Sequence, residues 1–162
     1  MPDIERLRPE HAPALLVFER DNREYFARSI PDRGDDFFEH FDARLRALLE
    51  EQAAGRCHFH VLVADDGSVV GRINLMDVAD GAADLGYRIA QKSAGQGLAQ
   101  RAVLRICELA RAEYGLTRLR AAAAADNAPS RAVLARTGFV PAGETTLNGR
   151  PGITFEKVLT YP

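Results

Sequence analysis

Asp84–Ala110, DLGYRIAQKSAGQGLAQRAVLRICELA, is the stretch that decides the fold. It holds an alternating apolar run over Leu85–Ile89, a small flexible turn over Lys92–Gly97, and a strongly amphipathic helix that begins near Leu98. The first N–H groups of a helix lack backbone partners, and the aligned peptide dipoles add partial positive charge there. Glycines allow the backbone to approach an anion closely. This order of strand, loop and helix therefore predicts a phosphate-binding device.

Glycine spacing alone is a weak signal, because Gly95-x-Gly97 also suits an ordinary tight turn before a core helix. The loop is neither G-x-x-x-x-G-K-[ST] nor G-x-G-x-x-G, whose third glycine would stand at Gln100. The pattern Lys92-x-x-Gly95-x-Gly97-x-Ala99 resembles the pyrophosphate loop of the GNAT N-acetyltransferase superfamily, Arg/Gln-x-x-Gly-x-Gly/Ala. Lys92 departs from that pattern but keeps a cation there.

A second segment, Asn127–Phe139 (NAPSRAVLARTGF), resembles the GNAT segment Asn-x-x-Ser-x-x-Val/Leu-x-x-x-x-Gly-Phe. Its Asn and Ser make it most similar to the Rim-type branch, which acetylates the N-termini of ribosomal proteins. Taken alone, Asn127 also suits a helix cap, and Gly138-Phe139 suits a helix stop followed by a core aromatic. The two motifs stand in the order and at an interval typical of the superfamily.

Apolar periodicity predicts a fold of the α/β (α+β) class in a single domain, 1–162. The order β-α-α-β-β-β-α-β-α-β-β matches the superfamily, which implies a mixed, mostly antiparallel sheet of about seven strands with helices on both faces. Expected strands are Ile4–Leu7, His58–Ala64, Val69–Val78, Ala83–Ala90, Leu116–Ala125, Phe139–Leu147 and Ile153–Tyr161, and expected helices are Ala12–Phe26, Asp35–Ala54, Leu98–Gly115 and Asn127–Arg136.

The strand expected at Leu116–Ala125 conflicts with helix propensity, because five of its residues are consecutive alanines. The segment is short, and Asp126–Pro129 breaks it. A strand parallel to the one before the loop is also the return that a crossover helix requires. We therefore expect a buried strand whose small side chains leave room for a bulky ligand.

The resemblance implies that acetyl-CoA and a primary amine meet in one ternary complex, where the amine attacks the thioester directly. Backbone groups near Arg88 and Ile89 would pair with the pantetheine arm, and Asn127 would bond the same arm. Ser130 would protonate the departing thiolate, since Leu134 stands where other members carry a tyrosine acid. The residues expected at the pyrophosphate are Lys92, Gly95, Gln96, Gly97, Leu98 and Ala99.

The general base is the least determined role. Rim-type enzymes carry a glutamate in the closing strand, which makes Glu144 the first candidate, with Asp77, Asp84 and Glu24 as alternatives. An α-amino group with a pKa of about 8 would need only water or a modest carboxylate. Alternating histidines in a strand, His58 and His60, are more often structural than catalytic. Tyr25 and Asn74 are candidates for the acceptor side, although Asn74 also suits a solvent-facing strand position.

Composition excludes several other classes of protein. The chain has 162 residues, 46% of them hydrophobic and 27% charged, with a net charge of −2, which is ordinary for a globular domain and argues against nucleic-acid binding by bulk charge. We expect no membrane span, no signal peptide and no metal, and a cytoplasmic location. The expected partner is a protein N-terminus or a small-molecule amine, with the chain as monomer or homodimer and the acyl group acetyl or longer. The alternative is a non-catalytic module that binds or senses CoA or a peptide.

Overall fold

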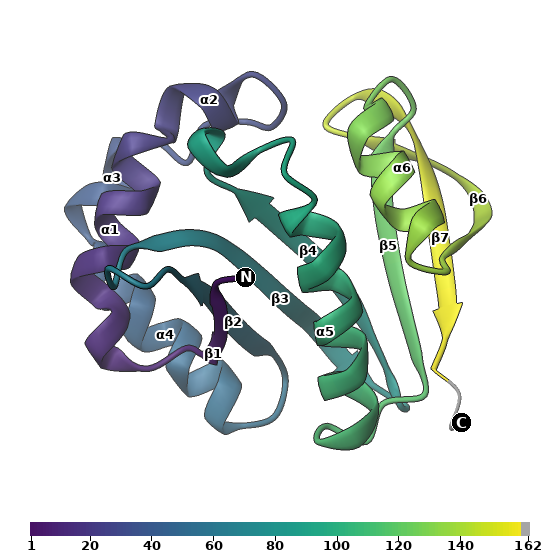
Figure 1. Ribbon diagram of the computed structural model, residues 1–162, viewed down its shortest axis with the longest axis horizontal. Coiled ribbons are helices and arrows are strands. Elements are labelled where there is room, and N and C mark those ends of the chain that lie inside the picture. Colours follow the sequence, from purple (N-terminus) through teal and green to yellow (C-terminus); the bar gives the residue numbers. More distant parts are fainter. Residues whose placement is uncertain (160–162) are drawn as a thin grey trace.

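The computed structural model describes residues 1–159 (Figure 1). Its strands are β1 Asp3–Arg6, β2 His58–Val63, β3 Val69–Ala79, β4 Ala82–Ile89, β5 Arg118–Ala124, β6 Val140–Leu147 and β7 Arg150–Val158. Its α-helices are α1 Ala12–Asp21, α2 Arg23–Ala27, α3 Asp35–Glu39, α4 Phe41–Ala53, α5 Leu98–Ala112 and α6 Ala128–Arg136, and short 3₁₀ turns occupy Pro9–His11 and Gln91–Ser93. In this part of the chain, no helix has the length and apolarity needed to cross a membrane.

The strands form one seven-stranded sheet in the order β1-β2-β3-β4-β5-β7-β6, which confirms the predicted mixed, mostly antiparallel architecture. Every described pair of neighbours is antiparallel except β4 and β5. The parallel pairing covers Ala82 to Asp84 on β4 against Arg118 to Arg120 on β5. Beyond that point the two strands diverge (Figure 1). A sheet that opens between two central strands leaves unpaired backbone groups at its middle, and such groups need a ligand or solvent.

Each face of the sheet has its own apolar core. The helix α5 places Leu98, Val103 and Ile106 against Ile73 and Leu75 of β3, and α6 joins the same face through Leu134. These two helices lie in front of the sheet in Figure 1. The opposite face is packed by α1 to α4 with a cluster rich in phenylalanine: Phe18, Phe26, Phe37, Phe41 and Phe59. The strand predicted at Leu116–Ala125 is confirmed as β5, but it is buried on one face only: Leu119, Ala121 and Ala123 belong to the first of these cores, and Ala122 is exposed.

The helix predicted over Ala12–Phe26 is two helices, α1 and α2, which meet at Asn22. The buried Asn22 side chain donates from Nδ2 to the carbonyl oxygen of Phe18 at 2.9 Å and accepts from the backbone N–H of Gln91 at 2.9 Å. Asn22 therefore ties the break to the start of the loop before α5. Side-chain bonding of this kind competes with helical backbone bonds, and no periodicity argument detects it.

The helix predicted over Asp35–Ala54 is also two helices, α3 and α4, which separate at His40 (φ −113°, ψ 29°). The closing hairpin differs as well: β7 begins at Arg150, so that the turn is only Asn148-Gly149, both with positive φ. That two-residue geometry is the one favoured by Asn-Gly. Thr160 and Tyr161 of the predicted last strand lie outside the described residues.

Two histidines of β2 form a cluster with Tyr114 at the end of α5. His60 Nδ1 donates to the carbonyl oxygen of Ile73 at 3.2 Å, and its Nε2 lies 2.6 Å from the Tyr114 hydroxyl. His58 stacks on the same ring, 3.8 Å between centroids. Burial lowers the pKa of His60 to about 4 and also lowers the pKa of His58. Both histidines are structural, as the sequence indicated.

We expect the free energy of unfolding to fall by about 2 kcal/mol between pH 7 and pH 5 because of His60 alone. Unfolded His60 takes a proton near its ordinary pKa of 6.5, whereas the native side chain resists protonation down to about 4. Stability is therefore highest above pH 6.5 and declines as the pH falls. Urea titrations of wild type and His60→Gln at both pH values measure the difference. If the free energy of unfolding fell by the same amount between pH 7 and pH 5 in both proteins, this account would be contradicted.

Candidate functional site

The divergence of β4 and β5 opens a cleft with two adjoining cavities of about 420 and 790 Å³. The smaller cavity is lined by Leu85 to Tyr87 of β4 and by the alanines Ala121 to Ala124 of β5. The larger cavity extends from α2 past β4 to the loop before α5. Gly86, Tyr87, Asn127 and Ser130 line both cavities, so the two parts of the cleft meet at these residues. The small side chains of β5 leave the expected room.

The loop before α5 has the geometry of an anion-binding site. Gly95 and Gly97 adopt left-handed backbone angles, φ 75° and 73°, and Gly97 is the N-cap of α5. A Cβ on Gly97 would lie 3.3 Å from Arg101 Nη1, which donates to the carbonyl oxygen of Gln96 at 3.2 Å. Only glycine adopts these angles without strain. The free N–H groups of the first turn of α5 and the helix dipole therefore face the cleft next to an arginine.

The residues expected at the ligand divide into two groups. Lining the larger cavity are Arg88, Ile89, Gly95, Gly97, Ala99, Asn127 and Ser130. Lys92, Gln96 and Leu98 do not line it: Lys92 borders a separate cavity, and the Leu98 side chain is 4% exposed in the core. For these three, only a backbone contact or a long-range charge fits the expected role, which stays a prediction.

The start of α6 brings two polar side chains to the junction of the cavities. Asn127 caps the helix, with its Oδ1 accepting from the Ser130 backbone N–H at 3.3 Å. Ser130 Oγ lies 3.2 Å from the Tyr87 hydroxyl of β4. The capping role predicted for Asn127 is thus present, and its side-chain N–H groups are not used by the cap.

Tyr87 is the functional candidate that the sequence did not reveal. In the alternating strand Leu85–Ile89, Tyr87 points to the same face as Leu85 and Ile89, and it packs against the core formed with α5 and α6. Burial raises the pKa of Tyr87, so that the phenol stays protonated at neutral pH and can donate a hydrogen bond. The only signal was a tyrosine in the strand that leads to the loop, and its position beside Ser130 of α6 depends on the tertiary fold.

The part of the cleft next to α2 contains the two candidates for acceptor binding. Tyr25 and Asn74 both line the larger cavity. Arg72 and Arg88 line it from the adjacent strands β3 and β4, and they pair directly in register. Arg72 Nη1 donates to Glu19 of α1 at 2.9 Å, and Arg88 Nη1 lies 3.4 Å from the other oxygen of that carboxylate.

None of the predicted base candidates lines either cavity. Glu144 is exposed on β6, the edge strand, and Asp84 accepts from Arg120 Nε at 2.8 Å where β4 and β5 are still paired. Asp77 and Glu24 are also exposed. Across residues 1–159, no aspartate or glutamate at all lines these two cavities. The role assigned to Glu144 stays a prediction.

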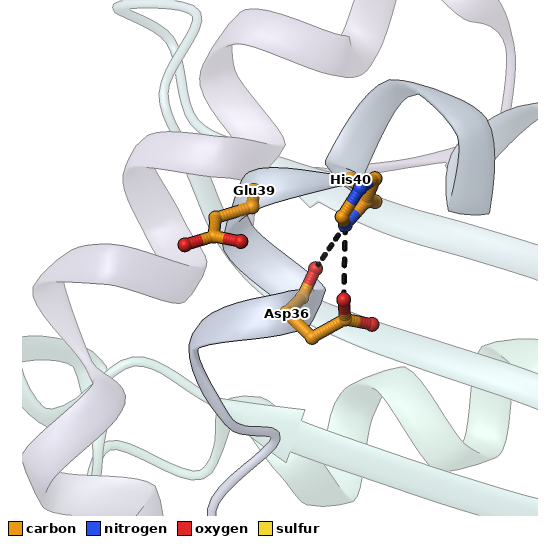
Figure 2. Close-up of side chains that lie close together, drawn as sticks. All are labelled: Asp36, Glu39 and His40. Carbon is orange, nitrogen blue, oxygen red and sulfur yellow. Dashed lines mark hydrogen bonds and ion pairs between the residues drawn. The ribbon is translucent and has the colours of Figure 1, made fainter.

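One group of side chains in residues 1–159 has the composition of a metal site: Asp36, Glu39 and His40 on α3 and after it. Figure 2 shows the His40 ring directed at Asp36, with Nδ1 3.0 Å from the carboxylate and 3.2 Å from the backbone carbonyl. Arg44 also binds Asp36, at 3.0 Å. All three residues are exposed and lie outside the cleft, so an ion pair at a helix end explains the arrangement.

Comparisons with known proteins agree with this geometry. The family described as "Acetyltransferase (GNAT) domain" matches residues 3–140. The chain is 37% identical over 81 residues to the candidate ribosomal N-acetyltransferase YdaF of Bacillus subtilis (strain 168); the match covers 49% of this chain and 44% of YdaF. The matched segment thus spans less than half the length of that relative.

Solved structures resemble the chain over nearly its whole length. The ribosomal-protein-S5-alanine acetyltransferase of Vibrio fischeri superposes with a TM-score of 0.90 and 25% identity, covering 98% of this chain and 94% of that one. RimJ of Mycobacterium smegmatis, solved with CoA-disulfide, gives a TM-score of 0.85 and 24% identity, covering 96% of this chain and 80% of that one. The second likeness supports the fold alone.

Proposed function

The chain belongs to the GNAT acetyltransferase family, and we propose that it transfers an acetyl group from acetyl-CoA to a primary amine, with a protein N-terminus as the first acceptor to test. The observation that carries this proposal is the cleft where β4 and β5 separate, with the α5 N-terminus at one end and Tyr87 and Ser130 at its middle. We propose that residues 1–162 act as a single domain.

Acetyl-CoA supplies an activated thioester, and the chain binds both reactants in one cleft. Backbone N–H groups from Gly95 to Ala99 hold the pyrophosphate, aided by the dipole of α5. The unpaired edge of β4 at Arg88 and Ile89 pairs with the pantetheine arm, and Asn127 Nδ2 donates to the same arm. An N–H group aimed at the thioester oxygen stabilises the developing oxyanion by about 3 kcal/mol.

The reaction forms a C–N bond and breaks the C–S bond. Holding the amine beside the thioester supplies most of the rate enhancement, because a reaction between two separate molecules becomes a reaction within one complex. Ser130 donates a hydrogen bond to the departing sulfur, and Tyr87 orients the Ser130 hydroxyl. Because residues 1–159 place no carboxylate in the lining, the amine loses its proton to solvent, and a neutral α-amine with a pKa of about 8 is the favoured nucleophile.

A second candidate function is a module that binds CoA or a peptide without turnover. The absence of aspartate and glutamate from the lining that residues 1–159 give to both cavities favours it. Such a module would bind acetyl-CoA through the same loop but would not release CoA when amines are added.

Two measurements test the proposed function. Calorimetry should show acetyl-CoA binding with a Kd in the micromolar range, corresponding to about −8 kcal/mol. Release of free CoA should then depend on an added amine in a panel of N-terminal peptides and small amines. Binding without any amine-dependent release would favour the non-catalytic module. Absence of acetyl-CoA binding would refute both the transferase and a CoA-binding module.

A further inference from the structure

The acceptor end of the cleft has an excess of positive charge. Three arginines surround the single carboxylate of Glu19: Arg72 Nη1 at 2.9 Å, Arg33 Nε at 3.2 Å and Arg88 Nη1 at 3.4 Å. All three arginines line the larger cavity, whereas Glu19 does not and is only 2% exposed. One buried carboxylate neutralises one guanidinium, so two positive charges remain beside the cleft.

Nearby acidic groups reduce this excess by one charge but do not cancel it, because two carboxylates share one arginine. Asp32 and Asp35 both bind Arg23, at 2.8 and 2.9 Å. Arg72 is 5% exposed, and burial together with neighbouring arginines lowers the pKa of Arg88 to about 10, which leaves it charged at neutral pH. Mutual repulsion and lost hydration disfavour such a cluster, and a bound anion relieves both.

The cluster lies on the acceptor's side of the sheet. Arg72 and Asn74 of β3 are paired with Arg88 and Gly86 of β4, so these residues share a face. Arg88 packs over the ring of Phe26 at 4.6 Å, in the layer of α1 and α2. Tyr87, one residue away, packs with the layer of α5 and α6 instead. A molecule that enters past α2 therefore meets the arginines before it reaches Tyr87 and Ser130.

We infer that the acceptor carries a carboxylate close to its primary amine, and that the arginine cluster around Glu19 binds this carboxylate while the amine faces the thioester. The inference rests on the proposed function and narrows its substrate class. Arg33 and Arg88 present the donors, since their side chains are 32% and 19% exposed, and Glu19 fixes their positions. Guanidinium groups suit carboxylates because their N–H donors match both oxygens.

The same charges exclude polyamines as preferred acceptors. A second ammonium group would enter a cavity lined by arginines without a carboxylate partner among residues 1–159. Two sources of the favoured chemistry exist: a protein N-terminus with an acidic residue in second position, or a free amino acid with its α-carboxylate. An ion network that only stabilises the fold is the contrasting account, and it predicts no effect of acceptor charge.

The test compares acceptors of different charge, with rates referred to the concentration of neutral amine because the amine pKa also differs between the members. Amidated peptides with N-terminal Ser and Glu, Gln or Lys in second position form one series. Alanine, alaninamide and spermidine form a second series, which distinguishes a free amino acid from a peptide. We expect kcat/KM to be on the order of tenfold higher for the acidic member than for its neutral counterpart in at least one series, and lowest for the cationic member.

The variants Arg33→Gln and Arg88→Met should each reduce that preference to about twofold or less, since each removes a charged donor. Arg33 lies in an exposed segment, so Arg33→Gln should fold normally and should bind acetyl-CoA as the wild type does. Arg20→Gln, an exposed arginine next to Glu19 that does not line either cavity, is the matched control and should keep the preference.

Calorimetry with acetyl-CoA tests the proposed acetyl transfer separately from the preference for acidic acceptors. Turnover with equal rates for acidic and neutral acceptors, or faster turnover of Lys peptides or spermidine, overturns the acidic-acceptor inference and leaves the proposed function standing. Failure to bind acetyl-CoA at all overturns the proposed function and this inference with it.

Discussion

Gly97→Glu should weaken acetyl-CoA binding by about 100-fold or more, roughly 2.7 kcal/mol. The residue is the N-cap of α5 at φ 73°, where the backbone N–H groups point into the cleft. A glutamate side chain there would fill the space that we propose for a diphosphate and would add a like charge within a few ångströms of it. Two unit charges 4 Å apart repel by about 1 to 4 kcal/mol near a protein surface. Isothermal titration of acetyl-CoA measures the loss.

The control for this change is Gly115→Glu, at the opposite end of α5. Gly115 also has a left-handed φ, 65°, and its Cβ would meet nothing within 4 Å. Both variants therefore carry a similar backbone strain of about 1 to 2 kcal/mol and the same added charge. Only Gly97→Glu lies at the loop, where its Cβ also comes within 3.3 Å of Arg101 Nη1. Gly115→Glu should bind acetyl-CoA within about twofold of wild type. Equal affinity of the two variants would refute the role of the loop.

Local periodicity was sufficient for most of the fold. Period-two alternation identified the strands around His58–Val63 and Val69–Ala79, and the amphipathic α5 followed from its apolar face. These elements could be predicted because burial of one face dictates the residue pattern. The alanines of β5 contradicted helix propensity, but the crossover topology decided correctly in favour of a strand.

Breaks within helices could not be predicted in the same way. Asn22 ends α1 because its side chain bonds both Phe18 and Gln91, and the second of these lies 69 residues further along the chain. The turn at His40 interrupts an apolar repeat that continues on both sides of it. In each case a tertiary contact or a local backbone angle interrupts the helix. The apolar periodicity continues through the break, so the sequence pattern alone does not reveal it.

The site shows the same division. The loop glycines, Asn127 and Ser130 could be identified because their motifs are contiguous in the sequence. Tyr87 and the cluster of Glu19 with three arginines could not, since their partners come from elements far apart in the chain. Glu144 was chosen because Rim-type enzymes carry a glutamate in the closing strand, but the position of that strand at the edge of the sheet is a property of the topology.

Ser130→Ala and Tyr87→Phe should each lower kcat by about 100-fold, and the double variant should be little worse than either one alone. The two hydroxyls are 3.2 Å apart and would act as a unit on the departing thiolate. Loss of the Ser130 hydroxyl removes the donor that we propose for the sulfur. Loss of the Tyr87 hydroxyl leaves the Ser130 side chain free to rotate away from the departing sulfur. Stopped-flow or steady-state release of CoA from each variant measures kcat.

Substrate affinity and a distant carboxylate provide the controls for this cycle. Both single variants should bind acetyl-CoA within about threefold of wild type, because neither hydroxyl is assigned to the pyrophosphate. Glu144→Gln should keep kcat within about twofold, since its side chain is exposed and outside both cavities. A large loss in Glu144→Gln would instead establish the glutamate predicted from the sequence as the base.

The size of the coupling decides between two roles for Tyr87. If Tyr87 acts only through Ser130, then Tyr87→Phe has no further effect in a Ser130→Ala background, and the coupling energy equals the whole effect of Tyr87→Phe, about 2.7 kcal/mol. If Tyr87 donates to the sulfur directly, the two losses multiply to about 10⁴-fold. Because burial raises the pKa of Tyr87, its hydroxyl stays protonated through neutral pH, and kcat should show no fall from its ionisation below about pH 10. A fall in kcat that begins near pH 8 and is absent from Tyr87→Phe would contradict a protonated donor at this position.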